Sequence, residues 1–99
     1  MAKEIIWNRT ARNNLRNIII YLNSEWGESV TEDFVVRVDE LVDTLSVQPE
    51  IGRIEESTKK PIRRAFITKH STLFYTIGAK SITLVSIFDN RQNPKKKRL

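Results

Sequence analysis

The sequence lacks cysteine altogether and has only one histidine. The absence of cysteine excludes disulfide bonds and metal sites built from thiolates, and it leaves the redox compartment open. Long apolar runs are missing too. The first residues, Met1 to Trp7, contain no signal-peptide core, and no stretch is long enough to span a bilayer. We therefore expect a cytoplasmic protein without a membrane partner.

The length of the chain limits its architecture. At 99 residues, it lies in the range of roughly 50–200 residues in which single cores form. Such a chain buries a modest core but has no room for a catalytic cleft between two lobes. We expect one domain over residues 1–94 and a basic tail over residues 95–99.

The formal net charge of +5 is concentrated at the end of the sequence. Lys95, Lys96, Lys97 and Arg98 supply four of these charges, and without them about +1 remains. A basic tail suits nucleic acid or an acidic protein as a partner. A solvated chain end that contacts nothing is the simpler interpretation, and both stay open.

Apolar residues at helical spacing predict two helices before Pro49, which stops the second. Thr10 is a candidate N-cap of the first helix, and Gly27 ends it. Ser29 and Glu32 form a capping-box pattern at the start of the second. The apolar stripes are Ala11, Leu15, Ile18, Ile19 and Leu22 in the first helix, and Val30, Phe34, Val38, Leu41, Val42 and Leu45 in the second.

Four segments are typical of strands. The first is Glu4–Trp7, and the others are Ile62–Thr68, Leu73–Ile77 and Ile82–Phe88, separated by short turns. Bulky groups on both faces of the last segment favour a central strand. The order β-α-α-β-β-β predicts an α+β fold, in which a helical hairpin packs on one face of a twisted antiparallel sheet.

Several segments, taken in order, resemble the small RelE/ParE-type toxins. Residues 11–22 are similar to the ParE-type pattern A-x-x-x-L-x-x-I-x-x-Y-L, and residues 49–53 close the signature F…L…P-x-x-G-R. Residues 61–64 and 73–77 resemble the strand pair R-x-x…L-x-Y-x-I of the family, and residues 88–94 resemble the end of ParE-like members. The order and spacing of these segments make the resemblance fairly specific.

The resemblance implies a toxin of a type II toxin–antitoxin pair, held inactive by a cognate antitoxin protein, with no cofactor and no metal. Members of the family divide by target. RelE-like toxins cut mRNA on the ribosome, whereas ParE-like toxins inhibit DNA gyrase without chemistry on RNA. Both branches share the fold, so the fold does not choose between them.

The residues available for RNA cleavage favour the ParE branch. RelE-like nucleases carry an arginine where this sequence has Thr72, and they commonly have a late histidine or tyrosine, which is missing after Tyr75. We therefore expect a non-enzymatic inhibitor of gyrase. The alternative is a ribosome-dependent mRNA endonuclease that uses another set of residues, namely Arg63, Arg64, His70 and Arg91. A basic nucleic-acid-binding module is a third interpretation, with poor support from the nearly balanced body of the chain.

Most candidate contact residues have a structural interpretation as well. His70 is expected in an exposed turn, and Arg63 and Arg64 on opposite faces of a strand, one of them paired with an acidic residue such as Glu32 or Asp39. Most aromatic residues, including Phe66, are expected in the core. Trp26 either packs back on the sheet or faces a partner. The candidate target- or partner-binding residues are Trp26, Arg63, Arg64, Asp89, Asn90, Arg91, Lys95, Lys96, Lys97 and Arg98, of which Asp89, Asn90 and Arg91 fix a turn equally well.

Overall fold

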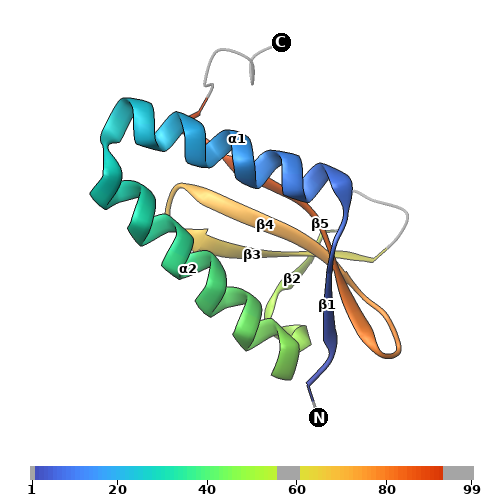
Figure 1. The fold of residues 1–99 in the computed structure, drawn as a ribbon. Coiled ribbons are helices and arrows are strands. Elements are labelled where there is room, and N and C mark those ends of the chain that lie inside the picture. The colour runs from blue at the N-terminus through green and yellow to red at the C-terminus, as the bar shows by residue number, and fades with distance from the viewer. Residues whose placement is uncertain (1, 56–60, 93–99) are drawn as a thin grey trace.

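The computed structural model describes residues 2–55 and 61–92. Its elements follow the predicted order, with one additional short strand (Figure 1). They are β1 (Glu4–Trp7), α1 (Arg9–Trp26), α2 (Glu28–Val47), the 3-10 turn η1 (Pro49–Ile51), β2 (Arg53–Glu55), β3 (Ile62–Thr68), β4 (Ser71–Ile77) and β5 (Ser81–Asp89).

One five-stranded sheet has the strand order β1-β5-β4-β3-β2. Strands β2 to β5 are antiparallel neighbours, whereas β1 runs parallel to β5. The helical hairpin joins β1 to the rest of the sheet and returns the chain to the start of β1, where the Lys3 N–H donates to the Ser46 carbonyl at 2.8 Å. A parallel pair requires a long connection of this kind between its strands. The predicted α+β fold is confirmed, and β1 is its one parallel strand among the described residues.

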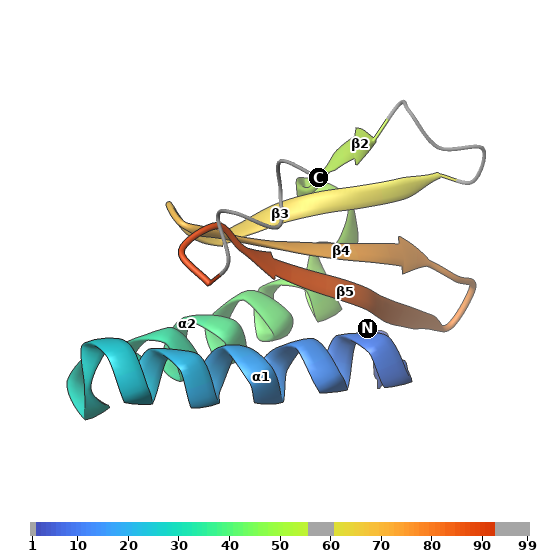
Figure 2. The ribbon, with the colours of Figure 1, turned by 90° about the horizontal axis from the view of Figure 1, so that it is seen from above.

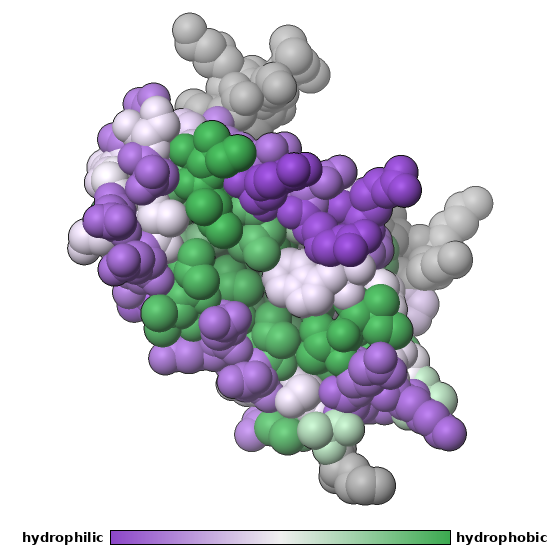
Figure 3. All heavy atoms as spheres, viewed as in Figure 1, coloured by the Kyte–Doolittle hydropathy of each residue, from purple (hydrophilic) through white to green (hydrophobic). Residues whose placement is uncertain are grey.

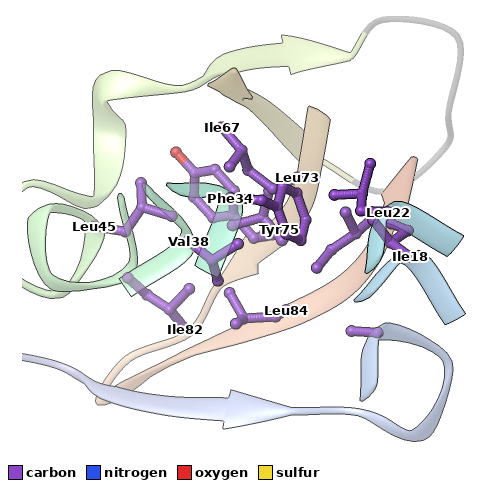
Figure 4. Packing of buried hydrophobic residues seen from close by; sticks show 12 residues of the cluster. Ile18, Leu22, Phe34, Val38, Leu45, Ile67, Leu73, Tyr75, Ile82 and Leu84 are labelled. Carbon is purple, nitrogen blue, oxygen red and sulfur yellow. The ribbon is translucent and has the colours of Figure 1, made fainter. Parts of the chain in front are cut away.

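Both helices cover the same face of the sheet (Figure 2). No helix in the described part of the chain covers the opposite face, which we call the open face. Their buried side chains meet those of β3, β4 and β5 in one apolar core (Figure 4). The core residues are Ala11, Ile18, Leu22, Phe34, Val38, Leu45, Ile67, Leu73, Tyr75, Ile82, Leu84 and Ile87. The predicted inward stripes of both helices are therefore correct in their central positions.

Strand β5 lies inside the sheet, as its composition predicts, but the helices cover only one of its faces. Ile82 and Leu84 alternate inward in the regular way, and then the register with β4 shifts around Val85. This bulge turns Ile87 inward and leaves Phe88 partly exposed, at 42%. The continuous apolar run therefore reflects a bulge and not two covered faces.

The predicted starts of both helices are wrong. Asn8, and not Thr10, caps α1, because its Oδ1 accepts a hydrogen bond from the Ala11 N–H at 2.8 Å. Helix α2 begins directly after Gly27 without a side-chain cap, so Ser29 lies inside its first turn and the capping box does not form. Gly27 ends α1 as predicted: its φ of 94° is disfavoured for other residues, and its N–H donates to the Leu22 carbonyl.

None of the helices in the described part of the chain has the length and apolar character of a membrane span.

Candidate functional site

The P-x-x-G segment is tied to the sheet by a buried tyrosine. The hydroxyl of Tyr75 donates to the Pro49 carbonyl at 2.7 Å and accepts from the Gly52 N–H at 2.9 Å. A Cβ at Gly52 would collide with this hydroxyl and would lie 2.8 Å from the Arg64 carbonyl oxygen. Burial raises the pKa of the Tyr75 hydroxyl, against the opposing effects of the Gly52 hydrogen bond and the Arg63 charge. These signature residues thus have a structural role.

Arg63 belongs to the same structural unit. Its Nη1 donates to the Gly52 carbonyl at 2.7 Å and to the Glu50 carbonyl at 3.2 Å. Arg64 pairs instead with Glu55 on the neighbouring strand, at 3.6 Å between Nη1 and Oε2. Both arginines therefore hold the segment that follows α2.

The expected ion pair between this arginine pair and the helices is wrong. Glu32 and Asp39 are exposed on α2, and the described residues contain no ion pair between them and Arg63 or Arg64. The prediction of opposite faces is consistent with the register, because the partner of Arg63 on β4 is Tyr75 in the core. Arg64 lies one residue further, on the open face of the sheet.

Thr72 stands where RelE-like nucleases carry an arginine, and it lies on this open face. Thr72 is paired with Phe66 on one side and with Phe88 on the other. Phe66 is 68% exposed, so its expected place in the core is wrong. The reason is its alternation with Ile67, which takes the inward position on β3.

The residues after β5 form a fixed turn. Arg91 makes a two-point ion pair with Asp89, with Nε 3.2 Å from Oδ1 and Nη2 3.0 Å from Oδ2. The Asp89 side chain is completely buried, and that of Arg91 is 17% exposed. The Asn90 N–H donates to the His70 carbonyl, which joins this turn to the turn between β3 and β4. The turn-fixing interpretation of Asp89, Asn90 and Arg91 agrees with these contacts.

Two of the sequence-predicted candidates, His70 and Arg91, meet at a hollow of about 310 Å³ between α2 and the sheet. Helix α2 contributes Val30, Asp33, Phe34 and Arg37 to its lining, and the turn between β3 and β4 contributes Thr68, Lys69 and His70. Asp33 and Arg37 were missed from the sequence, where their only signal is an i,i+4 charge pair. Arg63 and Arg64 do not line this hollow, which we call the Arg91 hollow.

A second concave surface runs along the outside of α1. This shallow groove, the α1 groove, has a volume of about 630 Å³ and is lined by Trp7, Arg12, Leu15, Arg16, Ile19 and Ile20. Figure 3 shows a broad apolar area over the helices, bordered on one side by hydrophilic side chains. Ile20 is 60% exposed, although it is a large apolar residue. One signal of this groove is present in the sequence: three consecutive isoleucines at 18–20 make the apolar stripe of the helix wider than the core requires.

Trp26 lies at the end of α1 next to the connection between the helices, and it is 56% exposed. Of its two predicted arrangements, packing back on the sheet is therefore wrong. The remaining candidates Lys95, Lys96, Lys97 and Arg98 lie outside the described residues. Within the described part of the chain, no group of three or more histidine or acidic side chains is placed to hold a metal ion.

One family model matches most of the chain. Residues 5–94 match the family described as "ParE toxin of type II toxin-antitoxin system, parDE". No curated protein matches the chain. The fold is similar to that of a chromosomal ParDE toxin–antitoxin system from P. aeruginosa, with a TM-score of 0.71 and 18% identity, covering 89% of this chain and 96% of that chain.

Two further solved structures share the fold. A copper-bound mutant toxin from Helicobacter pylori has a TM-score of 0.67 and 12% identity, covering 90% of this chain and 96% of that chain. The YoeB dimer from Staphylococcus aureus has a TM-score of 0.61 and 14% identity, covering 87% of this chain and 94% of that chain. At these identities, the likeness describes the fold and not the target.

Proposed function

Because the chain belongs to the ParE toxin family of type II toxin–antitoxin systems, we propose that it inhibits DNA gyrase and does not cleave RNA. The observation that carries this proposal is the surface around Thr72. Attack of a 2′-hydroxyl on RNA needs a base, a donor to the leaving oxygen and a cation near the phosphate. Thr72 is neutral and lies between Phe66 and Phe88, which supply none of these groups.

The other nuclease candidates also favour binding over chemistry. Arg63 is engaged with two backbone carbonyls, and Arg91 is held by the buried carboxylate of Asp89. His70 lies at the Arg91 hollow, and the sequence after Tyr75 supplies neither histidine nor tyrosine. Arg63 and Arg91 are thus held by contacts within the fold, and Arg64 pairs with Glu55 at 3.6 Å.

The target is tested by expressing the chain under tight control and measuring two products of toxicity side by side. We expect gyrase–DNA cleavage complexes and an SOS response, while reporter mRNA on translating ribosomes remains intact. His70→Ala should leave toxicity unchanged, because a binding surface on gyrase needs no proton relay. Codon-positioned cuts in mRNA that disappear in His70→Ala or Arg64→Ala would overturn the proposal in favour of the endonuclease.

We assign the α1 groove to the cognate antitoxin that the family implies. An apolar floor flanked by Arg12 and Arg16 suits an amphipathic helix whose polar border is acidic. The groove is a large exposed apolar surface on a small domain, and such surfaces commonly mark partner sites. Covering it would also remove Ile20 from water.

We assign target contact to Trp26 and to the basic residues Lys95, Lys96, Lys97 and Arg98. Exposed tryptophan side chains are among the strongest contributors to protein interfaces. Trp26→Ala should therefore reduce gyrase inhibition while affinity for the antitoxin stays the same. Val47→Ala, which removes a side chain of similar exposure (59%) near the other end of α2, is the matched control. If both variants inhibit gyrase equally, Trp26 does not contact the target.

A further inference from the structure

The Arg91 hollow combines positive charge with an apolar floor, and no role assigned so far explains it. We propose that it is a second docking point, which takes an aspartate or glutamate side chain of the antitoxin together with an apolar neighbour. This inference rests on the existence of a cognate antitoxin and is independent of gyrase as the target. The hollow shares no lining residue with the α1 groove.

Arg91 is held in place for binding. Its Nε and Nη2 are bound to the buried Asp89, its backbone N–H donates to the same carboxylate, and its carbonyl accepts from the Tyr21 hydroxyl at 2.7 Å. Within residues 2–55 and 61–92, its Nη1 makes no hydrogen bond. A guanidinium fixed on one edge and open on the other binds a carboxylate with little loss of conformational freedom.

Two further cations reach the same hollow from separate elements. Arg37 comes from α2, is 53% exposed and is bound there by Asp33 at 3.3 Å. It is also the only basic residue of α2, a helix otherwise rich in carboxylates. Lys69 comes from the turn between β3 and β4, beside His70. With Asp33 as the one lining carboxylate and Asp89 already paired, the cations are in excess, so an incoming carboxylate is attracted.

The floor of the hollow favours a peptide over nucleic acid. Its apolar part is supplied by the partly exposed Val30, with the buried Phe34 beneath it. A phosphate would leave this apolar surface unused, whereas an apolar side chain next to an acidic one covers it. A volume of about 310 Å³ accommodates one or two side chains and not a whole helix. Figures 1 and 2 show α2 beside the end of the sheet where β3 turns into β4, so an antitoxin chain reaches the hollow by passing across this end.

Docking at both sites gives affinity that neither site supplies alone, because binding of the antitoxin at one site raises its effective concentration at the other.

The test uses the toxin and the antitoxin encoded beside it, with affinity measured by titration calorimetry at several salt concentrations. The variant Arg37→Glu/Lys69→Glu reverses two exposed charges of the hollow. The control Arg53→Glu/Lys80→Glu makes the same change in net charge at exposed positions that line neither concave surface.

We expect the hollow variant to bind about 10–100-fold more weakly, with a smaller salt dependence, and the control to change affinity by less than about 3-fold. A lysine in place of the responsible antitoxin carboxylate should restore binding to the hollow variant. Thermal unfolding of both variants should match the wild type, which separates docking from folding.

Equal losses in the two variants would reduce the effect to net charge and overturn the proposal, as would no loss in either. Labelled single-stranded RNA that binds the wild type and not the hollow variant, with antitoxin affinity unchanged, would assign the hollow to nucleic acid instead. Gyrase assays on the same proteins are independent of these outcomes. Failure of the docking proposal therefore leaves the gyrase proposal standing, and the reverse also holds.

Discussion

Helices α1 and α2 are nearly equal in length, at 18 and 20 residues, and each buries one stripe against the same sheet. Their outer faces differ in charge. Helix α1 carries three arginines and one glutamate, whereas α2 carries six acidic residues and one arginine. The inner faces are alike because both pack on the core. Outside the core, α1 lines the apolar α1 groove, whereas α2 lines the more polar Arg91 hollow. An acidic partner is attracted to α1 and repelled by most of α2.

The inner faces should respond alike to truncation. Phe34→Ala in α2 should lower the free energy of unfolding by about 3–5 kcal/mol, and Ile18→Ala in α1 by about 2–5 kcal/mol, because both side chains are 1% exposed. Denaturant midpoints measure both effects. Val36→Ala, at a 51% exposed position of α2, is the control and should cost less than about 0.5 kcal/mol. A small effect at Ile18 beside a large one at Phe34 would break the equivalence of the inner faces.

One tyrosine joins each helix to the sheet, and the two joints should differ in strength. Tyr75→Phe removes a donor to Pro49 just after α2 and leaves the Gly52 N–H unpaired in a buried place, at a cost of about 1–3 kcal/mol. Tyr21→Phe removes one partly buried bond to the Arg91 carbonyl, at a cost of about 0.5–1.5 kcal/mol. Chemical denaturation of the two variants checks the order, and the opposite order would contradict it.

Tyr75 should also make the free energy of unfolding depend on pH, and Tyr21→Phe serves as the comparison. The pKa of Tyr75 is raised above 10.0 in the folded protein by burial, so above that pH the folded chain keeps a proton that the unfolded chain loses. The free energy of unfolding therefore falls as pH rises from about 10 toward the folded pKa, and the contribution is fully present below 10. Denaturation at pH 8 and above 10 should show a smaller alkaline loss in Tyr75→Phe than in Tyr21→Phe. Equal alkaline losses would contradict this assignment.

The outer faces are compared by reversing their charges. Arg12→Glu/Arg16→Glu on α1 should weaken antitoxin binding about 10–100-fold, equivalent to about 1.4–2.7 kcal/mol, since both arginines border the α1 groove. Asp39→Lys/Glu40→Lys on α2 is the matched change and should leave affinity equal or slightly higher. Binding measured at low and high salt separates the two. If the α2 variant loses as much affinity for the antitoxin as the α1 variant, the antitoxin contacts both helices.

The smallest difference lies at the helix starts. Asn8→Ala removes the side-chain cap of α1 and should cost about 1 kcal/mol. Ser29→Ala should be close to neutral, because α2 has no side-chain cap and Ser29 lies exposed in its first turn. Thermal unfolding of the two variants is the measurement. If Ser29→Ala lowers the stability as much as Asn8→Ala, the capping box predicted from the sequence forms after all.

Features that depend on local sequence patterns were mostly predicted correctly, whereas pairings between distant residues were not predicted. Strand β3 has the bounds that its composition predicts, and the helices follow their apolar stripes. Cap positions failed because Thr10 and Ser29 are as suitable by residue type as the true boundary residues. The parallel pairing of β1 with β5 has no local signal, since about seventy residues separate the strands.

In the candidate site too, residue types were predicted from the sequence, whereas the contacts between distant residues were not. His70 and Arg91 were chosen for their chemistry, and the structure brings them to one hollow, but Arg37 joins them from a helix far away in the sequence. The contacts of Arg63 with the Gly52 and Glu50 carbonyls depend on the path of the chain after α2. Residue type alone does not distinguish such a structural arginine from one that binds a target.

The parallel pair of β1 and β5 also sets the order in which a newly made chain is completed. Residues 4–7 emerge from the ribosome before their partners at 81–84, and both helices and three strands are made in between. Until then β1 has no neighbour in the sheet, and Trp7 and Ile5 lack the strand they pack beside. The sheet of a nascent chain therefore stays incomplete until residues 81–84 have been synthesised, which delays the finished fold until that point.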